Sequence, residues 1–256
     1  MNVIQGGFPK TGNFTILASC DSIYLRKHGL AFVSSCSLAN DVHIHIINPT
    51  KDDIDYATSL QAMILLWKKK NINGNTPFGL TVTWEESHLS NLSDEERRAY
   101  YACNRFLVAP TIMRQSKGSL LITDIDCLIN RRIFKPAEDV GLFLRESLPG
   151  TVGWEARGTR VAAGAVFYND TDSALIFADK VEDRICEQDF KWFSDQVSIS
   201  EVYEEEKNNC SYHYYDSTFL DWEFISHTYI WTGKGERKHN NLKYLQRKAY
   251  YEGLIQ

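Results

Sequence analysis

Two aspartates at the end of an apolar run are the residues of this chain best placed to do chemistry. The run Ser119–Ile129 reads Ser-Leu-Leu-Ile-Thr-Asp-Ile-Asp-Cys-Leu-Ile, so one residue separates Asp124 from Asp126. Residues at i and i+2 of an extended segment point to the same side, and the two carboxylates can therefore converge on one cation. Hard divalent ions such as Mg²⁺ or Mn²⁺ select oxygen ligands and keep positions for water or phosphate oxygens. The pattern favours a metal–diphosphate site, although a polar turn that ends a core strand would have the same sequence.

Other polar residues could take part in such a site, and each also has an ordinary structural explanation. Asp21 follows the first apolar strand and could bind a nucleoside, but taken alone it is better explained as a helix cap, where aspartate is favoured. Arg105, one helical turn from Tyr101, carries a planar donor fork that suits a phosphate, the aspartate pair or a plain ion pair. Asp195 and Gln196 could face a reacting sugar or simply begin a helix.

A histidine and a glycine-flanked lysine occur late in the chain. His227 lies shortly before Thr232-Gly-Lys-Gly235. A histidine can complete a metal site that two aspartates begin, and Lys234 could reach diphosphate oxygens because its neighbour Gly233 lets the backbone approach closely. Taken alone, His227 is better explained as a structural histidine.

Composition and charge bound the classes of function. The chain has 256 residues, of which 43% are apolar and 12% aromatic, enough for one large domain with a substantial core. A net charge of −5 argues against sequence-independent binding of nucleic acid. No apolar stretch is long enough to span a bilayer, and the first residues lack the features of a targeting segment, so we expect a cytoplasmic protein without a transmembrane segment. The six scattered cysteines form no C-x-x-C pair and are expected to be free thiols.

The elements that must position these residues follow from the hydrophobic pattern. We expect strands over residues 14–19, 42–47, 78–83 and 160–168, besides the run that ends at the aspartate pair. We expect helices over residues 30–38, 54–70 and 171–187, and another that the capping box Ser93-Asp-Glu-Glu96 opens and that runs through Arg105 towards Ala109. Alternating strands and helices predict an α/β layered sheet, in which ligands bind beyond the carboxyl ends of the strands.

Taken together, these blocks resemble the retaining glycosyltransferases of family 8, the family of glycogenin and the lipopolysaccharide galactosyltransferases. The blocks occur in the family's order and are Ala18–Asp21 with Tyr24 and Ala31–Asn40, Tyr100–Phe106 running into Leu120–Asp126, Ala163–Asn169 followed by Ser194–Gln196, and His227 with Gly233 and Lys234. The resemblance spans residues 14–235, most of the chain. It implies the GT-A fold, a Rossmann-like α/β arrangement with a mixed, mostly parallel sheet flanked by helices.

The resemblance also implies roles for individual residues. Asp124 and Asp126, the DXD motif, would bind Mn²⁺ or Mg²⁺ together with His227. The other implied contacts are Asp21 and Tyr24 to the nucleoside, Lys234 with Gly233 to the diphosphate, Arg105 to the metal-site region or donor sugar, and Asp195 and Gln196 to the transferred sugar. Residues 1–205 would form the nucleotide-sugar-binding core, and residues 206–256 an extension that completes the same domain.

The expected function is transfer of a sugar from a nucleoside-diphosphate sugar, by family analogy a UDP-sugar, to an acceptor hydroxyl. The acceptor could be a glycan, a lipid-linked molecule or a protein, and the residues leave the stereochemical outcome and a homo-oligomeric state open. One alternative is a sugar-nucleotide or glycan-binding module of the same fold without turnover, because the family has Asn-Ala-Gly where this chain has Ala162-Ala-Gly164. A phosphohydrolase with an aspartate nucleophile is a weaker alternative, since its usual Thr or Val is replaced by Leu128.

Overall fold

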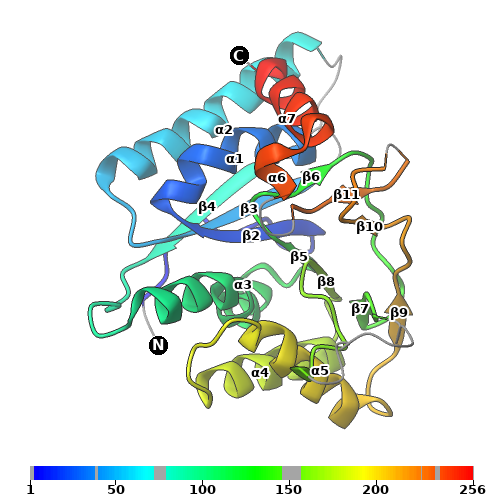
Figure 1. Ribbon diagram of the computed structural model, residues 1–256. Helices are drawn as coiled ribbons and strands as arrows, with labels where there is room; N and C mark the ends of the chain where they lie inside the picture. The colour runs from blue at the N-terminus through cyan, green and yellow to red at the C-terminus, as the bar shows by residue number, and fades with distance from the viewer. Residues whose placement is uncertain are drawn as a thin grey trace.

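An eight-stranded sheet forms the centre of the protein (Figure 1). The computed structural model describes residues 3–37, 40–71, 79–145, 157–225, 227–233 and 237–255. The strand order is β1-β4-β3-β2-β5-β8-β7-β9. The strands are β1 (Gln5–Gly6), β2 (Thr15–Asp21), β3 (Asp41–Ile47), β4 (Leu80–Glu85), β5 (Leu120–Thr123), β7 (Val140–Leu142), β8 (Ala165–Tyr168) and β9 (Tyr212–Tyr214).

The middle of the sheet is parallel. β4, β3, β2 and β5 run in one direction, with β2 paired to β3 from Thr15 opposite Asp41 to Asp21 opposite Ile47. β8 is antiparallel to both β5 and β7, and β1 is antiparallel to β4. The expected α/β class with a mixed, mostly parallel sheet is therefore confirmed. β2 and β5 end at the same edge, so Asp21 and the residues that follow Thr123 lie near one another.

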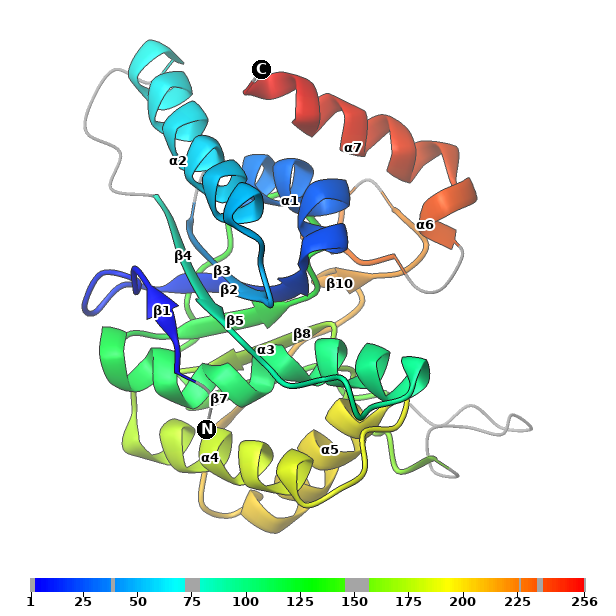
Figure 2. The same cartoon turned by 90° about the vertical axis from the view of Figure 1, so that its left-hand side faces the viewer.

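Helices cover both faces of the sheet (Figures 1 and 2). One face carries α1 (Ser22–Ser37), α2 (Lys51–Asn71) and α7 (Leu242–Leu254), and the other carries α3 (Asp94–Ser116), α4 (Asp172–Cys186) and α5 (Ser194–Glu206). Because both faces are covered, the central strands are almost wholly buried, which explains their continuous apolar runs. None of the helices in the described ranges is long and apolar enough to cross a membrane.

Helix α3 begins as expected and ends later than expected. Ser93 accepts a hydrogen bond from the backbone of Glu96, whose side chain accepts one from Ser93, so the capping box is confirmed. The helix nevertheless continues beyond Pro110 to Ser116. An interior proline costs about 3 kcal/mol, but burying a large apolar side chain contributes about 1.5–3 kcal/mol, and Ile112 and Met113 beyond it are both buried. Packing on the sheet therefore outweighs the local penalty.

Two other boundaries also differ from the expected ones. Helix α1 begins at Ser22, directly after β2, and therefore starts well before residue 30, where the pattern placed the start of a helix. The strand expected over residues 160–168 is confined to β8, and Val161 forms an isolated bridge with Leu144. Sequence patterns place the middle of an element more reliably than its ends.

The last fifty residues pack against the rest of the chain at several points. β9 joins the edge of the large sheet, and β10 (Leu220–Asp221) and β11 (Ile230–Trp231) form a small second sheet with β6 (Leu128–Ile129). Helix α6 (Arg237–Asn240) follows, and α7 packs on α1 although the two are far apart in sequence. This return of the chain brings α6 beside the turn that contains Asp124 and Asp126. The division at residue 205 stays a prediction.

Candidate active site

Asp124 and Asp126 lie in a tight turn at the end of β5. The strand ends at Thr123, and the backbone N–H of Cys127 donates to the carbonyl of Asp124 at 3.1 Å. The expectation of an extended segment at this point was therefore wrong, because the chain already turns at Asp124. The carboxylates converge all the same: ligand atoms of Asp124, Asp126 and Cys127 lie within 4.8 Å of one another.

Arg105 bridges the first aspartate of this turn and the first turn of helix α5. Its Nη1 lies 2.6 Å from Asp124 Oδ1, and its Nη2 lies 3.0 Å from Asp195 Oδ2. Nη2 also donates to the carbonyl of Ala163 at 3.2 Å. Arg105 and Asp195 are both buried, while the Asp124 side chain remains 34% exposed. Burial raises the pKa of Asp195, and Arg105 opposes that effect. The guanidinium thus holds two carboxylates from separate elements at one edge of the sheet.

A polar network anchors α3, and with it Arg105, to the sheet. Asn104 donates to Glu85 at 3.0 Å and accepts from Ser19 at 2.6 Å, which links α3 to β4 and β2. Glu85 also accepts from Tyr100 at 2.7 Å. Burial tends to raise the pKa of Glu85, but hydrogen bonds from a nearby histidine, a serine and Tyr100 lower it to about 2. The residue before Arg105 is therefore held by buried, charge-assisted hydrogen bonds.

Lys238, which sequence reasoning missed, lies on the second aspartate. Its Nζ donates to Asp126 Oδ2, both side chains are buried, and the ammonium lies 5.2 Å from the centre of the Tyr24 ring. The lysine side chain crosses Gly233, where a Cβ would collide with it. Tyr244 Oη donates to the Asp126 carbonyl at 2.6 Å and holds α7 against the same turn. The basic stretch after Gly233 indicated that a cation could reach the aspartates, but it contains several lysines and arginines, and the sequence does not show which of them pairs with Asp126.

Gln196 is held by a second arginine that sequence reasoning did not single out. Arg145 Nη2 lies 2.5 Å from Gln196 Oε1, and Nη1 donates to the Thr159 carbonyl at 2.9 Å. Because arginine has only donors, the amide oxygen of Gln196 must face it. The amide N–H₂ group of Gln196 consequently faces away from Arg145 and is the end available to a ligand. Asp195 Oδ1 accepts from the backbone N–H of Gln196 at 2.8 Å, so both residues are fixed.

Asp21 is the last residue of β2, and Tyr24 lies in the first turn of helix α1. Asp21 Oδ1 accepts from the Tyr24 backbone N–H at 2.8 Å, the geometry of a helix cap. Asp21 therefore acts as a helix cap in this structure, and its contact with a nucleoside stays a prediction. Tyr24 is 41% exposed and has one side towards Lys238.

The structure does not bring His227 into the aspartate group, and Lys234 falls outside the residues that it describes. His227 is exposed, and it does not belong to the group of ligand atoms around Asp124 and Asp126. Lys234 lies outside the described residues, while its neighbour Gly233 is half-buried under Lys238. Over the described ranges, the structure gathers Asp21, Tyr24, Arg105, Asp124, Asp126, Asp195 and Gln196 along one edge, with Lys238 added.

The donor atoms of the turn suit a hard divalent ion. Asp124 and Asp126 offer carboxylate oxygens, the ligands that Mg²⁺ and Mn²⁺ prefer. Burial raises the pKa of the Cys127 thiol well above its ordinary value, so the thiol stays protonated at neutral pH and is a poor ligand. A metal would therefore be held by the two carboxylates, with its other positions left for water or phosphate.

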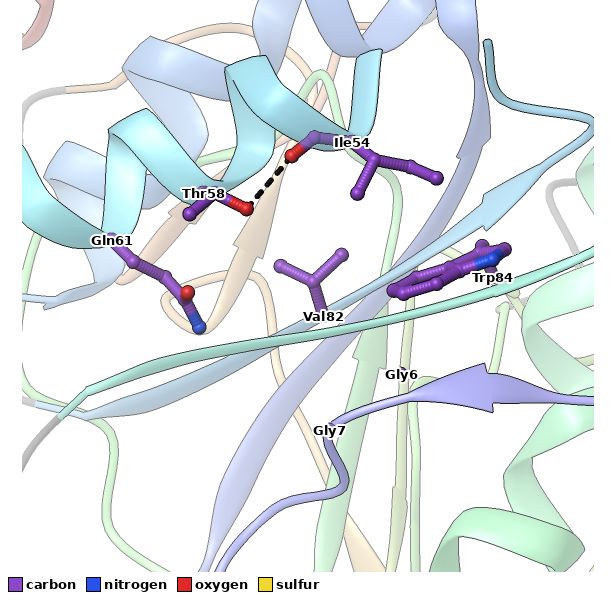
Figure 3. Close-up of a pocket in the computed structure, with 7 residues that line it drawn as sticks. All are labelled: Gly6, Gly7, Ile54, Thr58, Gln61, Val82 and Trp84. Atoms are coloured by element: carbon purple, nitrogen blue, oxygen red, sulfur yellow. Dashed lines mark hydrogen bonds between the residues drawn. The ribbon is translucent and has the colours of Figure 1, made fainter. Parts of the chain in front are cut away.

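A pocket elsewhere in the molecule lacks the groups for this chemistry. It lies between α2 and the strands β1 and β4, has a volume of about 230 Å³, and is drawn in Figure 3. Thr58 and Gln61 reach it from α2, and Trp84 from β4, with glycines and apolar side chains completing the wall. None of its lining residues is charged, so it offers no cation for a diphosphate and no carboxylate for a metal.

Comparison with known proteins shows likeness in fold. No family model matches the sequence, and a comparison with the curated proteins finds no match. Among solved structures, the glycosyltransferase GlyE of Streptococcus pneumoniae TIGR4 matches with a TM-score of 0.57 and 11% identity over 96% of this chain. Mouse xyloside xylosyltransferase 1 matches with a TM-score of 0.48 and 12% identity, over 88% of this chain and 98% of its own. The chain spans 62% of the GlyE structure. The likeness to GlyE establishes a glycosyltransferase-like fold, and membership of family 8 stays a prediction.

Proposed function

We propose that the protein is a metal-dependent glycosyltransferase that moves a sugar from a UDP-sugar to an acceptor hydroxyl with retention of configuration. The observation that carries the proposal is the row of charged groups at one sheet edge, where Arg105 joins Asp124 to Asp195 and Lys238 joins Asp126. This edge lies beyond the carboxyl ends of parallel strands, where ligands of such sheets bind. The likeness in fold to a glycosyltransferase supports the same conclusion.

The end of the site around Asp126 suits the departing diphosphate. Breaking a sugar–phosphate bond concentrates negative charge on the nucleoside diphosphate. A divalent ion held by Asp124 and Asp126 would supply Lewis-acid stabilisation of that charge. Lys238 adds a second cation, and its contacts with Tyr24 and Gly233 keep it at this end of the site, where a nearby positive charge stabilises the departing diphosphate.

The end around Asp195 and Gln196 suits the sugar. Asp195 is held by Arg105 and by the backbone of Gln196, so it is positioned to orient sugar hydroxyls. Gln196 presents N–H donors, because Arg145 occupies its amide oxygen. Asp124 and Asp195 are both engaged by Arg105, so neither is a free base for the acceptor. This favours attack from the leaving-group side, with the departing phosphate taking the proton, and hence retention.

A thermal-shift panel of nucleoside diphosphates and sugar nucleotides, with and without Mn²⁺, tests the proposal. We expect stabilisation by one nucleotide that requires Mn²⁺ and is lost in Asp126→Asn. The matched control is Asp170→Asn, because Asp170 pairs with the exposed Lys135 at 2.5 Å and touches none of the site residues. If no nucleotide of the panel raises the melting temperature in a way that depends on Mn²⁺, the proposal is wrong.

Release of nucleoside diphosphate from the responding donor separates an enzyme from a binding module of the same fold. The position of His227 outside the aspartate group is the observation that favours the binding module. Turnover that disappears in Asp126→Asn supports the transferase. Tight metal-dependent binding with no release, even with added acceptor sugars, would favour the module.

A further inference from the structure

The ion pair between Lys238 and Asp126 occupies a carboxylate that a metal would need. Asp126 belongs to the group of ligand atoms within 4.8 Å of one another, and its Oδ2 already accepts from the lysine ammonium. The two side chains are 10% and 8% exposed, so water screens their attraction only weakly. Asp124 is likewise engaged, by Arg105 at 2.6 Å.

The charges around the turn are close to balance without a metal. Asp124, Asp126 and Asp195 carry three negative charges, and Arg105 and Lys238 carry two positive charges, which leaves one net negative charge when all are ionised. A divalent ion alone would make this buried cluster positive and would place it beside an ammonium group. A metal that arrives with a doubly charged diphosphate would restore the present balance. Electrostatics thus oppose the metal alone and favour the metal with its nucleotide.

The surroundings of Lys238 keep the lysine near the site when it leaves Asp126. Its stem lies on Gly233 and its ammonium lies 5.2 Å from the Tyr24 ring, where cation–π attraction holds a charge that has lost its carboxylate. A lysine ammonium is a compact charge on a flexible stem, suited to exchanging one anionic partner for another. Arg105 is different, because its planar fork is fixed by two aspartates and a carbonyl.

We propose that Lys238 and a divalent ion compete for the Asp126 carboxylate, so that the metal enters only together with a diphosphate that takes over the ammonium group. The competition with the metal stands on the ion pair itself, while the transfer of the ammonium to a phosphate rests on the proposed function. Metal and nucleotide binding are then coupled through one side chain. A coupling of this kind changes affinities by roughly fivefold to a hundredfold.

Titration of Mn²⁺ against the purified chain, followed by the loss of the electron paramagnetic resonance signal of free Mn²⁺, tests the competition. In the wild type we expect weak binding of Mn²⁺ that tightens about tenfold or more when UDP is present. In Lys238→Met, Mn²⁺ alone binds about tenfold more tightly than to the wild type, and UDP tightens it much less. Lys238→Arg keeps the charge and binds Mn²⁺ as weakly as the wild type. Lys135→Met, which removes the exposed partner of Asp170, leaves the titration unchanged.

A second variant tests the same point with the lysine still present. In Gly233→Ala the added Cβ crowds the Lys238 stem, so the ammonium is displaced from Asp126 and Mn²⁺ again binds more tightly. Equal or weaker Mn²⁺ binding in both Lys238→Met and Gly233→Ala, including no binding by any variant, overturns the proposal. If Lys238→Met gains Mn²⁺ affinity but no variant binds UDP, the competition stands and the proposed transferase fails. If UDP and Mn²⁺ bind together with turnover but Lys238→Met binds Mn²⁺ no more tightly than the wild type, the proposed transferase stands and the competition fails.

Discussion

Replacement of Arg105 by glutamine tests whether this buried cation holds the site together. The change leaves Asp124 and Asp195 without the guanidinium that now lies 2.6 Å and 3.0 Å away. Removing one partner of a buried ion pair costs roughly 3–5 kcal/mol, because the remaining charge stays out of water. For a chain of this size about 1 kcal/mol lowers Tm by roughly 2–4 °C, so Arg105→Gln should lower it by roughly 6–20 °C.

The matched control lies on the same helix. Arg114 pairs with Asp179 at 2.5 Å, but its side chain is 46% exposed, so Arg114→Gln should cost less than about 1 kcal/mol. The double variant Arg105→Gln with Asp195→Asn replaces the pair by two neutral amides. Its loss of stability should fall short of the sum of the single losses by roughly 0.5–3 kcal/mol. Urea unfolding at pH 7 measures these three variants and the single variant Asp195→Asn.

The cost of Arg105→Gln should also depend on pH. Burial already raises the pKa of Asp124 and Asp195, and loss of Arg105 raises it further. The native variant then holds protons that the unfolded chain releases above about pH 4, so its stability falls as the pH rises from there. The gap to the wild type should therefore widen between pH 4 and pH 8. A cost equal to that of Arg114→Gln, strict additivity in the double variant, or a gap independent of pH would refute the reasoning.

Three further changes have expected outcomes. Glu85→Gln should cost about 1.5–3 kcal/mol in urea unfolding at pH 7. The pKa of Glu85 is lowered from 4.5 to about 2, so its ionised carboxylate stabilises the fold above about pH 4.5, and this stabilisation is lost as the pH falls towards 2. Glu85→Gln lacks this carboxylate and should therefore show a flatter acid-unfolding curve. An unchanged curve would contradict the assignment. Arg145→Leu frees the Gln196 amide and should lower kcat roughly tenfold to a hundredfold with KM little changed, whereas Arg145→Lys retains part of the rate; a pure KM effect would argue against positioning. Tyr244→Phe leaves the Asp126 carbonyl without its donor and should lower stability by about 1–3 kcal/mol in thermal unfolding, and a neutral effect would show that the bond adds nothing.

Local patterns predicted most of the fold. The buried runs of β2, β3 and β5 and the capping box of α3 follow from residues close together in the chain, because strand and helix periodicity and cap hydrogen bonds are local. Pro110 shows the limit of that reasoning. The helix passes through it because Ile112 and Met113 are buried against elements that the local pattern does not contain.

The sequence by itself indicated that the carboxylates of Asp124 and Asp126 at a strand end would converge, while only the family resemblance added Arg105, Asp195 and Gln196 to them. Only the tertiary structure decided which cation meets which carboxylate. Lys238 reaches Asp126 across 112 positions because β10 and β11 dock on β6 and α7 packs on α1, while Gly233 leaves room for the lysine. Ion pairs of this kind depend on where distant segments come to rest, and several lysines and arginines of the C-terminal stretch were equivalent until the chain had folded. The same closure left His227 exposed and outside the group formed by Asp124 and Asp126.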